Sequence, residues 1–128
     1  MVRSSKIRIL AVDQNPLLRE GLAILIRLQP DMELVGMVES YEEAVHGFAL
    51  KRPDVTVMDL DLPSGTGLTA IREILKITPD TCIIGTSTYE WNESCTQAIR
   101  AGARSCIPKD RLNQDLVSLV RDCVRRAD

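Results

Sequence analysis

The stretch Val55-Thr-Val-Met-Asp59-Leu-Asp-Leu-Pro-Ser-Gly-Thr-Gly67 decides the fold of this chain. Residues 55–58 are apolar or β-branched, and such a short run is typical of a buried strand. The run ends at the carboxylate of Asp59, and a loop rich in Pro, Ser and Gly then leads to a helical pattern near Gly67. Open α/β sheets bind ligands where strands end in loops between helices, so Asp59 is the first candidate functional residue.

Length and composition limit the class of protein. The chain has 128 residues, and we expect residues 1–128 to form a single domain with its own core. Its net charge of −2 gives no overall basic field for nucleic acid or an anionic membrane. No apolar run approaches the ~20 residues of a membrane span, and residues 1–6 do not resemble a signal peptide. We therefore expect a cytoplasmic protein that does not contact a membrane.

Four cysteines are spread singly along the chain: Cys82, Cys95, Cys106 and Cys123. They form no Cys-x-x-Cys pair, so neither a zinc site nor thioredoxin-like chemistry is supported. Free cysteine is among the most buried residue types, and thiols stay reduced in the cytoplasm. The prediction is four buried thiols in a reducing compartment.

Strand patterns alternate with helical patterns five times. Strands are expected at residues 6–12, 33–38, 55–58, 81–86 and 105–107, and a helix follows each of them. In the fourth helix, Cys95, Ala98 and Ile99 are predicted to face inward. This alternation favours one parallel sheet with helices on both faces. The predicted helix caps are Asn15 before Pro16, Ser40 with Glu43, Gly102 and Asn113.

Polar side chains follow four of the five strands. Asp13, Asp59, Ser87 and Lys109 each stand at or just after the end of a different strand. Crossovers between parallel strands are right-handed, so these strand ends meet at one edge of the sheet. The set suits phosphoryl transfer, because a carboxylate can accept a phosphoryl group and become an acyl phosphate. Neighbouring carboxylates require a divalent cation such as Mg²⁺, while a hydroxyl and an ammonium bind the phosphoryl oxygens.

At this point the sequence resembles a known family, the receiver domain of bacterial two-component response regulators. The resemblance rests on Ile-Leu-Ala-Val-Asp13-Gln-Asn-Pro, Val-Met-Asp59-Leu-Asp-Leu-Pro, Ser87-Thr88 and Ala-Gly-Ala-Arg-Ser-Cys-Ile-Pro-Lys109-Asp. It covers nearly the whole chain. Pro-Leu-Leu-Arg-Glu-Gly-Leu and Arg-Ala-Gly-Ala look most like the subfamily with a LuxR-type helix-turn-helix output.

The resemblance implies a fold and a role. The fold would be flavodoxin-like, a doubly wound five-stranded parallel sheet of strand order 2-1-3-4-5. Asp59 would be the phosphoacceptor for a sensor histidine kinase, with Ser87 and Lys109 beside it. Mg²⁺ would be bound by Asp13, Asp59 and the backbone carbonyl of Asp61. The chain would not be an enzyme. It would pass on a conformational change or form a homodimer, and it would reach DNA only through an output domain outside this chain.

Two positions depart from the family pattern. Gln14 stands where a second acid usually follows the first strand, so it would be a weak metal ligand, and Mg²⁺ affinity should fall with ligand charge. Cys106 stands where the family usually has Tyr or Phe, and it is too small for the same steric role. These departures leave a second reading open, a degenerate receiver that acts as a docking module without phosphorylation.

Rival functions have weaker support. Asp59-Leu-Asp61 also resembles the opening motif of haloacid-dehalogenase-type phosphatases, but two strand–helix units precede it here. The loop after the first strand lacks the Gly-x-Gly-x-x-Gly of a dinucleotide-binding domain. His46 is predicted to be an exposed helix residue. Cations at the end of the last helix suit its dipole and need not bind nucleic acid: Arg121, Arg125 and Arg126.

Overall fold

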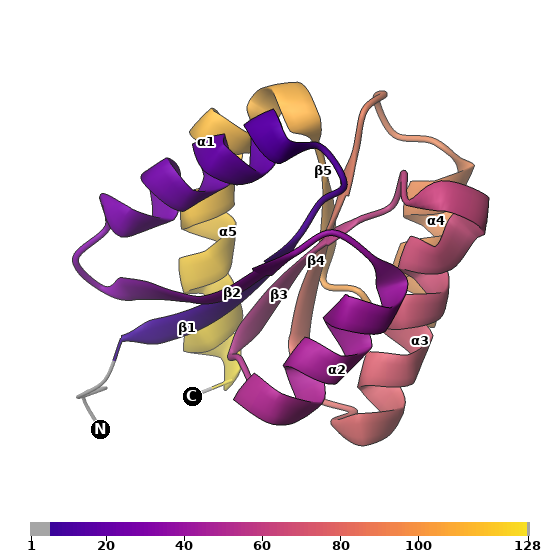
Figure 1. The fold of residues 1–128 in the computed structure, drawn as a ribbon, viewed down its shortest axis with the longest axis horizontal. Coiled ribbons are helices and arrows are strands. Elements are labelled where there is room, and N and C mark those ends of the chain that lie inside the picture. Colours follow the sequence, from indigo (N-terminus) through magenta and orange to yellow (C-terminus); the bar gives the residue numbers. More distant parts are fainter. Residues whose placement is uncertain (1–5, 128) are drawn as a thin grey trace.

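A computed structural model describes residues 6–127 as one parallel sheet with a helix after each strand (Figure 1). The strand order is β2-β1-β3-β4-β5, which confirms the predicted flavodoxin-like fold. The strands are β1 (Ile7–Val12), β2 (Met32–Val38), β3 (Val55–Asp59), β4 (Cys82–Ser87) and β5 (Ser105–Pro108). The helices are α1 (Pro16–Arg27), α2 (Tyr41–Lys51), α3 (Thr66–Ile77), α4 (Glu93–Ala101) and α5 (Leu112–Ala127), with short 3-10 turns η1 (Pro63–Gly65) and η2 (Lys109–Arg111).

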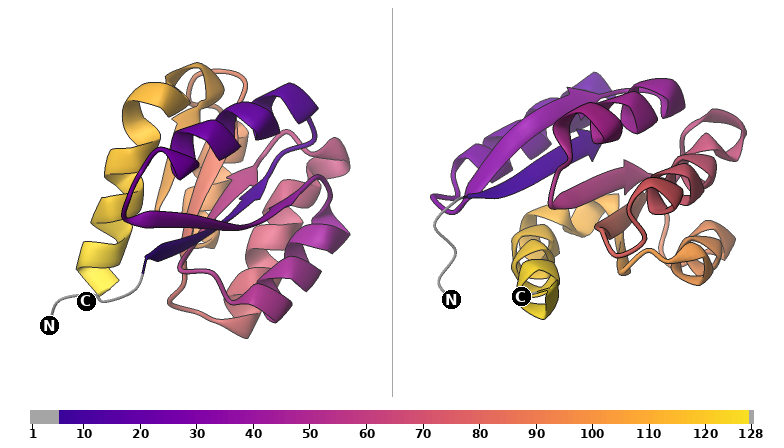
Figure 2. Two further views of the ribbon diagram at one scale, coloured as in Figure 1. Left: turned by 60° about the vertical axis from the view of Figure 1, so that its left-hand side comes forward. Right: turned by 90° about the horizontal axis from the view of Figure 1, so that it is seen from below.

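The helices cover the two faces of the sheet unequally. Helices α1 and α5 lie on one face, and α2, α3 and α4 lie on the other (Figures 1 and 2). Each face has its own apolar cluster, one against α1 and α5 and one against α2, α3 and α4. Central strand β3 contributes to both, because its residues point alternately to opposite faces. Every residue of β3 is buried, which explains why residues 55–58 read as a continuous run in the sequence.

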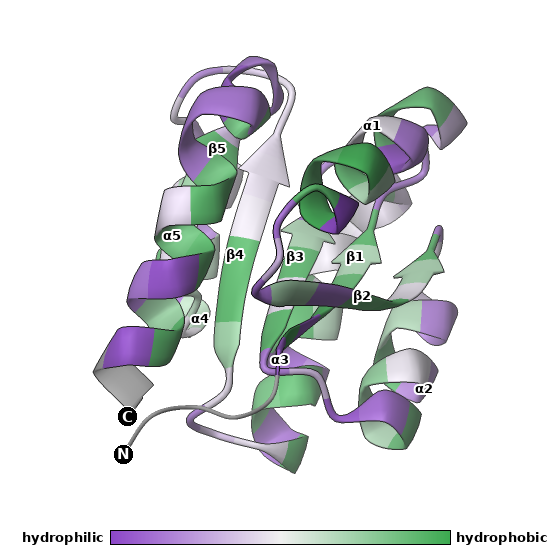
Figure 3. Cartoon of the chain, turned by 90° about the vertical axis from the view of Figure 1, so that its left-hand side faces the viewer, coloured by the Kyte–Doolittle hydropathy of each residue, from purple (hydrophilic) through white to green (hydrophobic). Residues whose placement is uncertain are grey.

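Hydropathy changes along strand β4 toward its carboxyl end. Figure 3 shows β4 apolar along its first residues and paler toward its carboxyl end, where Gly85, Thr86 and Ser87 lie. Thr86 and Ser87 are nevertheless fully buried. The buried polar side chains of β4 therefore lie at its carboxyl end.

Most of the predicted caps are present. Asn15 Oδ1 accepts hydrogen bonds from two backbone amides of α1, and Pro16 opens that helix. Ser40 Oγ accepts from the amide of Glu43 at 3.2 Å. Gly102 ends α4 with a φ of 122°, a conformation that favours glycine.

Two details of the last helices were predicted wrongly. Asn113 is not a cap, because η2 leads directly into α5 and the helix already begins at Leu112. Ile99 does not face inward but is 36% exposed, whereas Cys95 and Ala98 are buried as expected. The buried residues of helix α4 (Glu93–Ala101) are Cys95 and Ala98.

The cysteines correct the sequence analysis. The four predicted thiols are paired in two disulfides, Cys82–Cys123 and Cys95–Cys106. The sequence separations are 41 and 11 residues, so neither pair gives a local motif. The fold brings β4 against α5, and α4 against β5, and the cysteine Cα atoms come within 6.1 and 5.8 Å.

The remaining surface predictions concern charge. His46 is exposed on α2, as predicted. Arg121 does more than suit the helix dipole, because its guanidinium binds both carboxylate oxygens of Asp31 at 2.8 and 3.0 Å. This contact lowers the pKa of Asp31. Within residues 6–127, no helix is long and apolar enough to cross a membrane. The predicted absence of a leader at residues 1–5 and the side chain of Arg126 lie outside the described residues.

Candidate functional site

The fold brings the predicted side chains to one edge of the sheet. Asp13 follows β1, Asp59 ends β3, Ser87 ends β4 and Lys109 follows β5. The two aspartates and Ser87 are buried, with exposed fractions of 0–1%. Three of the four are in direct contact, because Lys109 bridges the two aspartates. The sequence therefore predicted correctly that these four residues lie at one edge of the sheet, and their functional roles stay predictions.

Asp59 is held from both sides by backbone amides. Its Oδ1 accepts a hydrogen bond from the amide of Asp61 at 2.8 Å, and its Oδ2 accepts one from the amide of Gln14 at 3.3 Å. The carboxylate is thus fixed between the loops after β1 and β3. Because these donors already hold the carboxylate in place, it would lose little further freedom of motion in a reaction.

Gly67 allows α3 to begin close to this carboxylate. A Cβ atom at Gly67 would lie 2.2 Å from the backbone oxygen of Asp59, a distance that backbone atoms cannot relieve. Glycine is therefore required here for close approach of two backbone segments. The glycine at which the sequence predicted the helical pattern to begin thus allows the first turn of α3 to lie against Asp59.

Lys109 is the cation of the site. Its Nζ lies 3.0 Å from Asp59 Oδ1, 3.1 Å from Asp13 Oδ2 and 3.5 Å from Asp61 Oδ2. Burial disfavours the ammonium, but the hydrogen bonds to Asp59 and Asp13 outweigh it and raise the pKa of Lys109. One ammonium thus partly neutralises three carboxylates.

Asp13 is the least satisfied of the acids. Burial, together with the charge of Asp59, raises the pKa of Asp13, although the amide of Asn15 and the ammonium of Lys109 oppose the shift. Asp13 Oδ1 accepts a hydrogen bond from the amide of Asn15 at 2.7 Å, and among the described residues the contact of Asp13 Oδ2 is the Lys109 ammonium at 3.1 Å. A buried carboxylate oxygen with so few contacts is suited to bind an additional cation.

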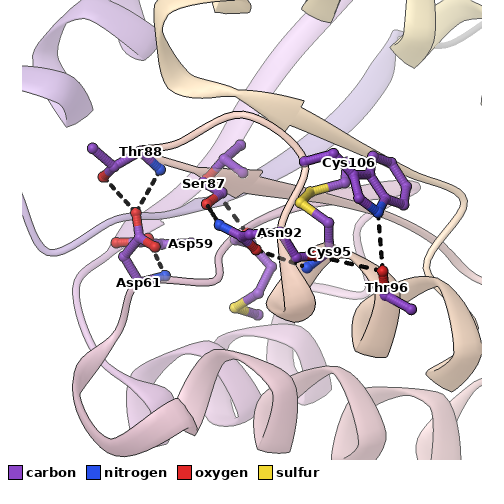
Figure 4. Close-up of a disulfide and its surroundings, with 11 residues drawn as sticks. Asp59, Asp61, Ser87, Thr88, Asn92, Cys95, Thr96 and Cys106 are labelled. Atoms are coloured by element: carbon purple, nitrogen blue, oxygen red, sulfur yellow. Dashed lines mark hydrogen bonds between the residues drawn. A yellow bond between two sulfur atoms is a disulfide. The ribbon is translucent and has the colours of Figure 1, made fainter.

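Asp61 links this site to the loop after β4. Its Oδ2 accepts hydrogen bonds from the amide of Thr88 at 2.7 Å and from the Thr88 hydroxyl (Figure 4). Burial alone would raise the pKa of Asp61, but the Thr88 hydrogen bonds and the Lys109 charge lower it. Sequence analysis had assigned only the Asp61 backbone a role, so this side-chain contact is new.

Gln14 occupies an unexpected position. Its side-chain Nε2 donates to the backbone oxygen of Asp61 at 3.0 Å. This is the carbonyl oxygen that the family resemblance assigns to Mg²⁺. In this arrangement the amide joins the loops after β1 and β3 across the predicted metal position.

Ser87 turns away from the acids. Its Oγ accepts a hydrogen bond from Asn92 Nδ2 at 2.9 Å (Figure 4). Asn92 also caps α4, because its Oδ1 accepts from the amide of Cys95 at 3.2 Å. Sequence analysis missed Asn92, although an asparagine directly before a helical pattern is a recognisable cap signal.

The oxygen-rich donor set fits Mg²⁺. Asp13 and Asp59 offer carboxylates and Asp61 offers a carbonyl, which are ligands that a hard divalent cation prefers. Among the described residues, no three His, Cys, Asp or Glu side chains form a ready metal group, so the backbone carbonyl is needed to complete the set. The buried Asp13 Oδ2, which contacts only the Lys109 ammonium among the described residues, supports the fit, and the Gln14 amide would have to turn away from the Asp61 oxygen.

A family comparison places the chain. Residues 9–121 match the model described as the response regulator receiver domain, and the chain belongs to that family. It is 36% identical over 117 residues to the DNA-binding transcriptional activator DevR/DosR of Mycobacterium tuberculosis, covering 91% of this chain and 54% of that protein. It is 33% identical over 119 residues to the oxygen regulatory protein NreC of Staphylococcus carnosus, covering 92% and 55%.

Solved structures agree with the fold. The response regulator domain of Thermotoga maritima CheB superimposes with a TM-score of 0.85 at 30% identity, covering 94% of this chain and 97% of that one. The receiver domain of the putative response regulator NarL from M. tuberculosis gives 0.86 at 25% identity, covering 94% and 98%. The haloacid-dehalogenase alternative is therefore wrong, because the whole fold and the family match belong to a receiver domain.

The chain spans about half the length of the first curated relatives that it matches, including the two transcriptional regulators. The relatives also differ in their named activity. A protein-glutamate methylesterase of Cereibacter sphaeroides is 33% identical over 127 residues, and the match covers 35% of that protein. The receiver fold alone therefore does not specify what a whole protein does.

Proposed function

We propose that Asp59 is the phosphoacceptor of this receiver domain, with a sensor histidine kinase as the donor. The observation that carries the proposal is the buried Asp59 carboxylate, fixed by two backbone amides and contacted by Lys109 at 3.0 Å. An Asp59 oxygen attacks phosphorus, an O–P bond forms and the P–N bond of a phosphohistidine breaks, leaving its electron pair on the histidine nitrogen. The product is an acyl phosphate on Asp59.

The neighbouring residues divide the remaining work. Lys109 stays protonated because its pKa is raised, so its ammonium is available to a phosphoryl oxygen throughout the neutral range. Ser87 donates its hydroxyl to a second oxygen once it leaves Asn92. Asp13, Asp59 and the Asp61 carbonyl would hold Mg²⁺, with Gln14 as a weak further ligand, and the cation would supply positive charge beside the phosphoryl oxygens.

The wider role follows from the same proposal. The chain itself has no catalytic turnover, acts in the cytoplasm and transmits the modification through a change of shape or a homodimer. Residues 1–128 form the receiver domain, and DNA is reached through an output domain outside this chain. The transcriptional activator and regulatory protein among the relatives support this role, because each is about twice as long as its match here.

Intact mass after incubation with acetyl phosphate and Mg²⁺ tests the assignment. Wild-type protein should gain one phosphoryl group, and Asp59→Asn should gain none. Asp54→Asn serves as a matched control, because Asp54 lies just before the same strand but at its other end. Uptake by Asp59→Asn at the wild-type rate would show that another residue is the acceptor.

A second candidate function is a docking receiver that works without phosphorylation. The specific observation in its favour is the hydrogen bond from Gln14 to the Asp61 oxygen, which engages an expected metal ligand with a neutral amide. In that case wild-type protein would remain unmodified in the same experiment. Gln14→Asp would then gain the phosphoryl group, since a carboxylate restores charge to the cation site.

A further inference from the structure

Ser87 is tied to the start of α4 through one side chain. Asn92 Nδ2 donates to Ser87 Oγ, and Asn92 Oδ1 accepts from the amide of Cys95 in the first turn of α4 (Figure 4). Ser87 is fully buried, so it cannot exchange this partner for solvent without a local rearrangement. Movement of Ser87 toward a phosphoryl group on Asp59 must therefore break this link or carry the start of α4 with it.

The start of α4 is in turn covalently attached to β5. Cys95, in the first turn of α4, forms a disulfide with Cys106, which pairs with Gly85 of β4 in the sheet register (Figure 4). The connection runs from Ser87 through Asn92 and Cys95 to a strand of the sheet. With the disulfide closed, the first turn of α4 is tethered to β5 and its shift relative to that strand is limited. Opening it leaves only non-covalent packing there.

We propose that Cys95–Cys106 is a thiol–disulfide modification site that controls the response of α4 to phosphorylation, a proposal that rests on the proposed function of Asp59. The disulfide state holds Asn92 and Ser87 in the retracted position. The dithiol state releases them, so Ser87 can approach the phosphoryl group. Disulfides in reducing compartments are mostly transient or redox-sensing, which agrees with a bond placed on a moving element.

The exchange reaction uses a dithiol reductant. Its thiolate attacks the Sγ of Cys106, because Cys106 is partly exposed whereas Cys95 is 2% exposed. The Cys95–Cys106 bond breaks, a mixed disulfide forms at Cys106, and Cys95 leaves as a thiolate that takes up a proton. The second reductant thiol attacks the mixed disulfide, so Cys106 leaves as a thiol and the reductant is oxidised by two electrons. A disulfide of the same class reverses the reaction.

The second disulfide supplies a matched control. Cys82 begins β4 at the opposite end of the strand from Ser87, and its partner Cys123 lies in α5 on the other face of the sheet. Cys95 and Cys106 belong to the cluster under α2, α3 and α4. Opening Cys82–Cys123 should change stability without releasing Ser87.

The experiment compares oxidised and dithiothreitol-reduced protein by hydrogen exchange, with and without beryllium fluoride and Mg²⁺ as the phosphoryl mimic. In Cys82→Ala/Cys123→Ala, where Cys95–Cys106 is the remaining disulfide, the mimic should alter exchange across residues 87–102 after reduction, and oxidation should abolish that change. In Cys95→Ala/Cys106→Ala the change should be present in both redox states. Asn92→Ala should show it even when oxidised, because Ser87 is then released directly.

Mimic occupancy, measured by fluorine NMR, separates the two proposals. Equal occupancy with equal exchange changes in oxidised and reduced Cys82→Ala/Cys123→Ala would overturn the redox proposal and leave Asp59 as phosphoacceptor. Absence of occupancy in every redox state and variant would overturn both, and would identify the phosphoacceptor assignment as the cause. A redox effect that persists in Cys95→Ala/Cys106→Ala would move the control to Cys82–Cys123 and reject the present assignment.

Discussion

The two halves of the site are held by different kinds of contact. The acidic half, Asp13, Gln14, Asp59 and Asp61, is positioned largely by backbone amides at the ends of β1 and β3. The responding half, Ser87, Asn92, Cys95 and Cys106, is connected through a side-chain hydrogen bond, a helix cap and a disulfide. Backbone contacts fix the acids as part of the fold. Side-chain contacts and a reducible bond can be exchanged without unfolding the sheet.

The two halves also differ in their place in the sheet. The acidic half sits on central strands β1 and β3, with neighbours on both sides, while β5 is an edge strand and α4 is a short helix. A structural change costs less free energy at the edge of the sheet, because fewer packed neighbours must move. If the proposals above hold, binding and response would lie in parts of the molecule that differ in how many packed neighbours surround them.

The largest expected effect is on the acidic half. Lys109→Met removes the ammonium that contacts Asp13 and Asp59, both buried, and should lower the free energy of unfolding at neutral pH by about 3–5 kcal/mol. Mg²⁺ should restore part of this loss, because it replaces the missing positive charge. Urea unfolding with and without Mg²⁺ measures both. Lys76→Met, at an exposed position, is the control, and equal stability of the two variants would contradict the role of Lys109.

The two disulfides should differ in their effect on stability. Loop-closure entropy predicts a loss of about 4 kcal/mol for Cys82→Ala/Cys123→Ala, with a separation of 41 residues. The same relation predicts about 3 kcal/mol for Cys95→Ala/Cys106→Ala, with a separation of 11 residues. Non-reducing urea unfolding of the oxidised proteins checks the order. A larger loss of unfolding free energy in Cys95→Ala/Cys106→Ala would contradict this order and would mean that the Cys95–Cys106 disulfide stabilises more than the contact between α4 and β5.

Gln14 tests whether the acidic half is weakened as a metal site. Gln14→Asp should raise Mg²⁺ affinity by about tenfold, or 1.4 kcal/mol, because a charged ligand replaces a neutral amide. The metal-free variant should be less stable than wild type, since another carboxylate joins Asp13 and Asp59. Calorimetry measures the affinity. Gln114→Asp, at an exposed position of α5, carries the same charge change and should leave the Mg²⁺ affinity unaltered. Equal Mg²⁺ affinities of wild type and both variants would refute the prediction.

The smallest expected effect concerns the contact between the halves. The pKa of Asp61 is lowered in the folded protein, so its contribution to stability is present above the unfolded pKa of 3.8 and is lost as pH falls through the lower folded value. The side chain is 27% exposed, so the contribution should be below about 1 kcal/mol. Unfolding followed from neutral pH to acid should therefore show a shallower acid loss in Asp61→Asn than in wild type. An identical acid limb would show that the Thr88 contact carries no charge-dependent stability.

The alternation of strands and helices could be predicted from the order of residues, because period and length distinguish a buried strand such as 55–58 from the amphipathic helices around it. The same order also predicted that Asp13, Asp59, Ser87 and Lys109 would share an edge, since parallel strands with right-handed crossovers all end on the same side. These are consequences of local pattern and chain topology. Neither requires knowledge of which side chains touch.

The contacts between residues far apart in the chain could not be predicted from the sequence. The pairing of Cys95 with Cys106 depends on how α4 lies against β5, and the partner of Ser87 depends on where the loop from β4 returns to Asn92. The Gln14 amide meets the Asp61 oxygen 47 residues away for the same reason. Periodicity carries no information on such distances, because they arise from the packing of whole elements. The candidate site residues could therefore be predicted from the sequence, whereas the contacts that they make across the fold could be seen only in the structure.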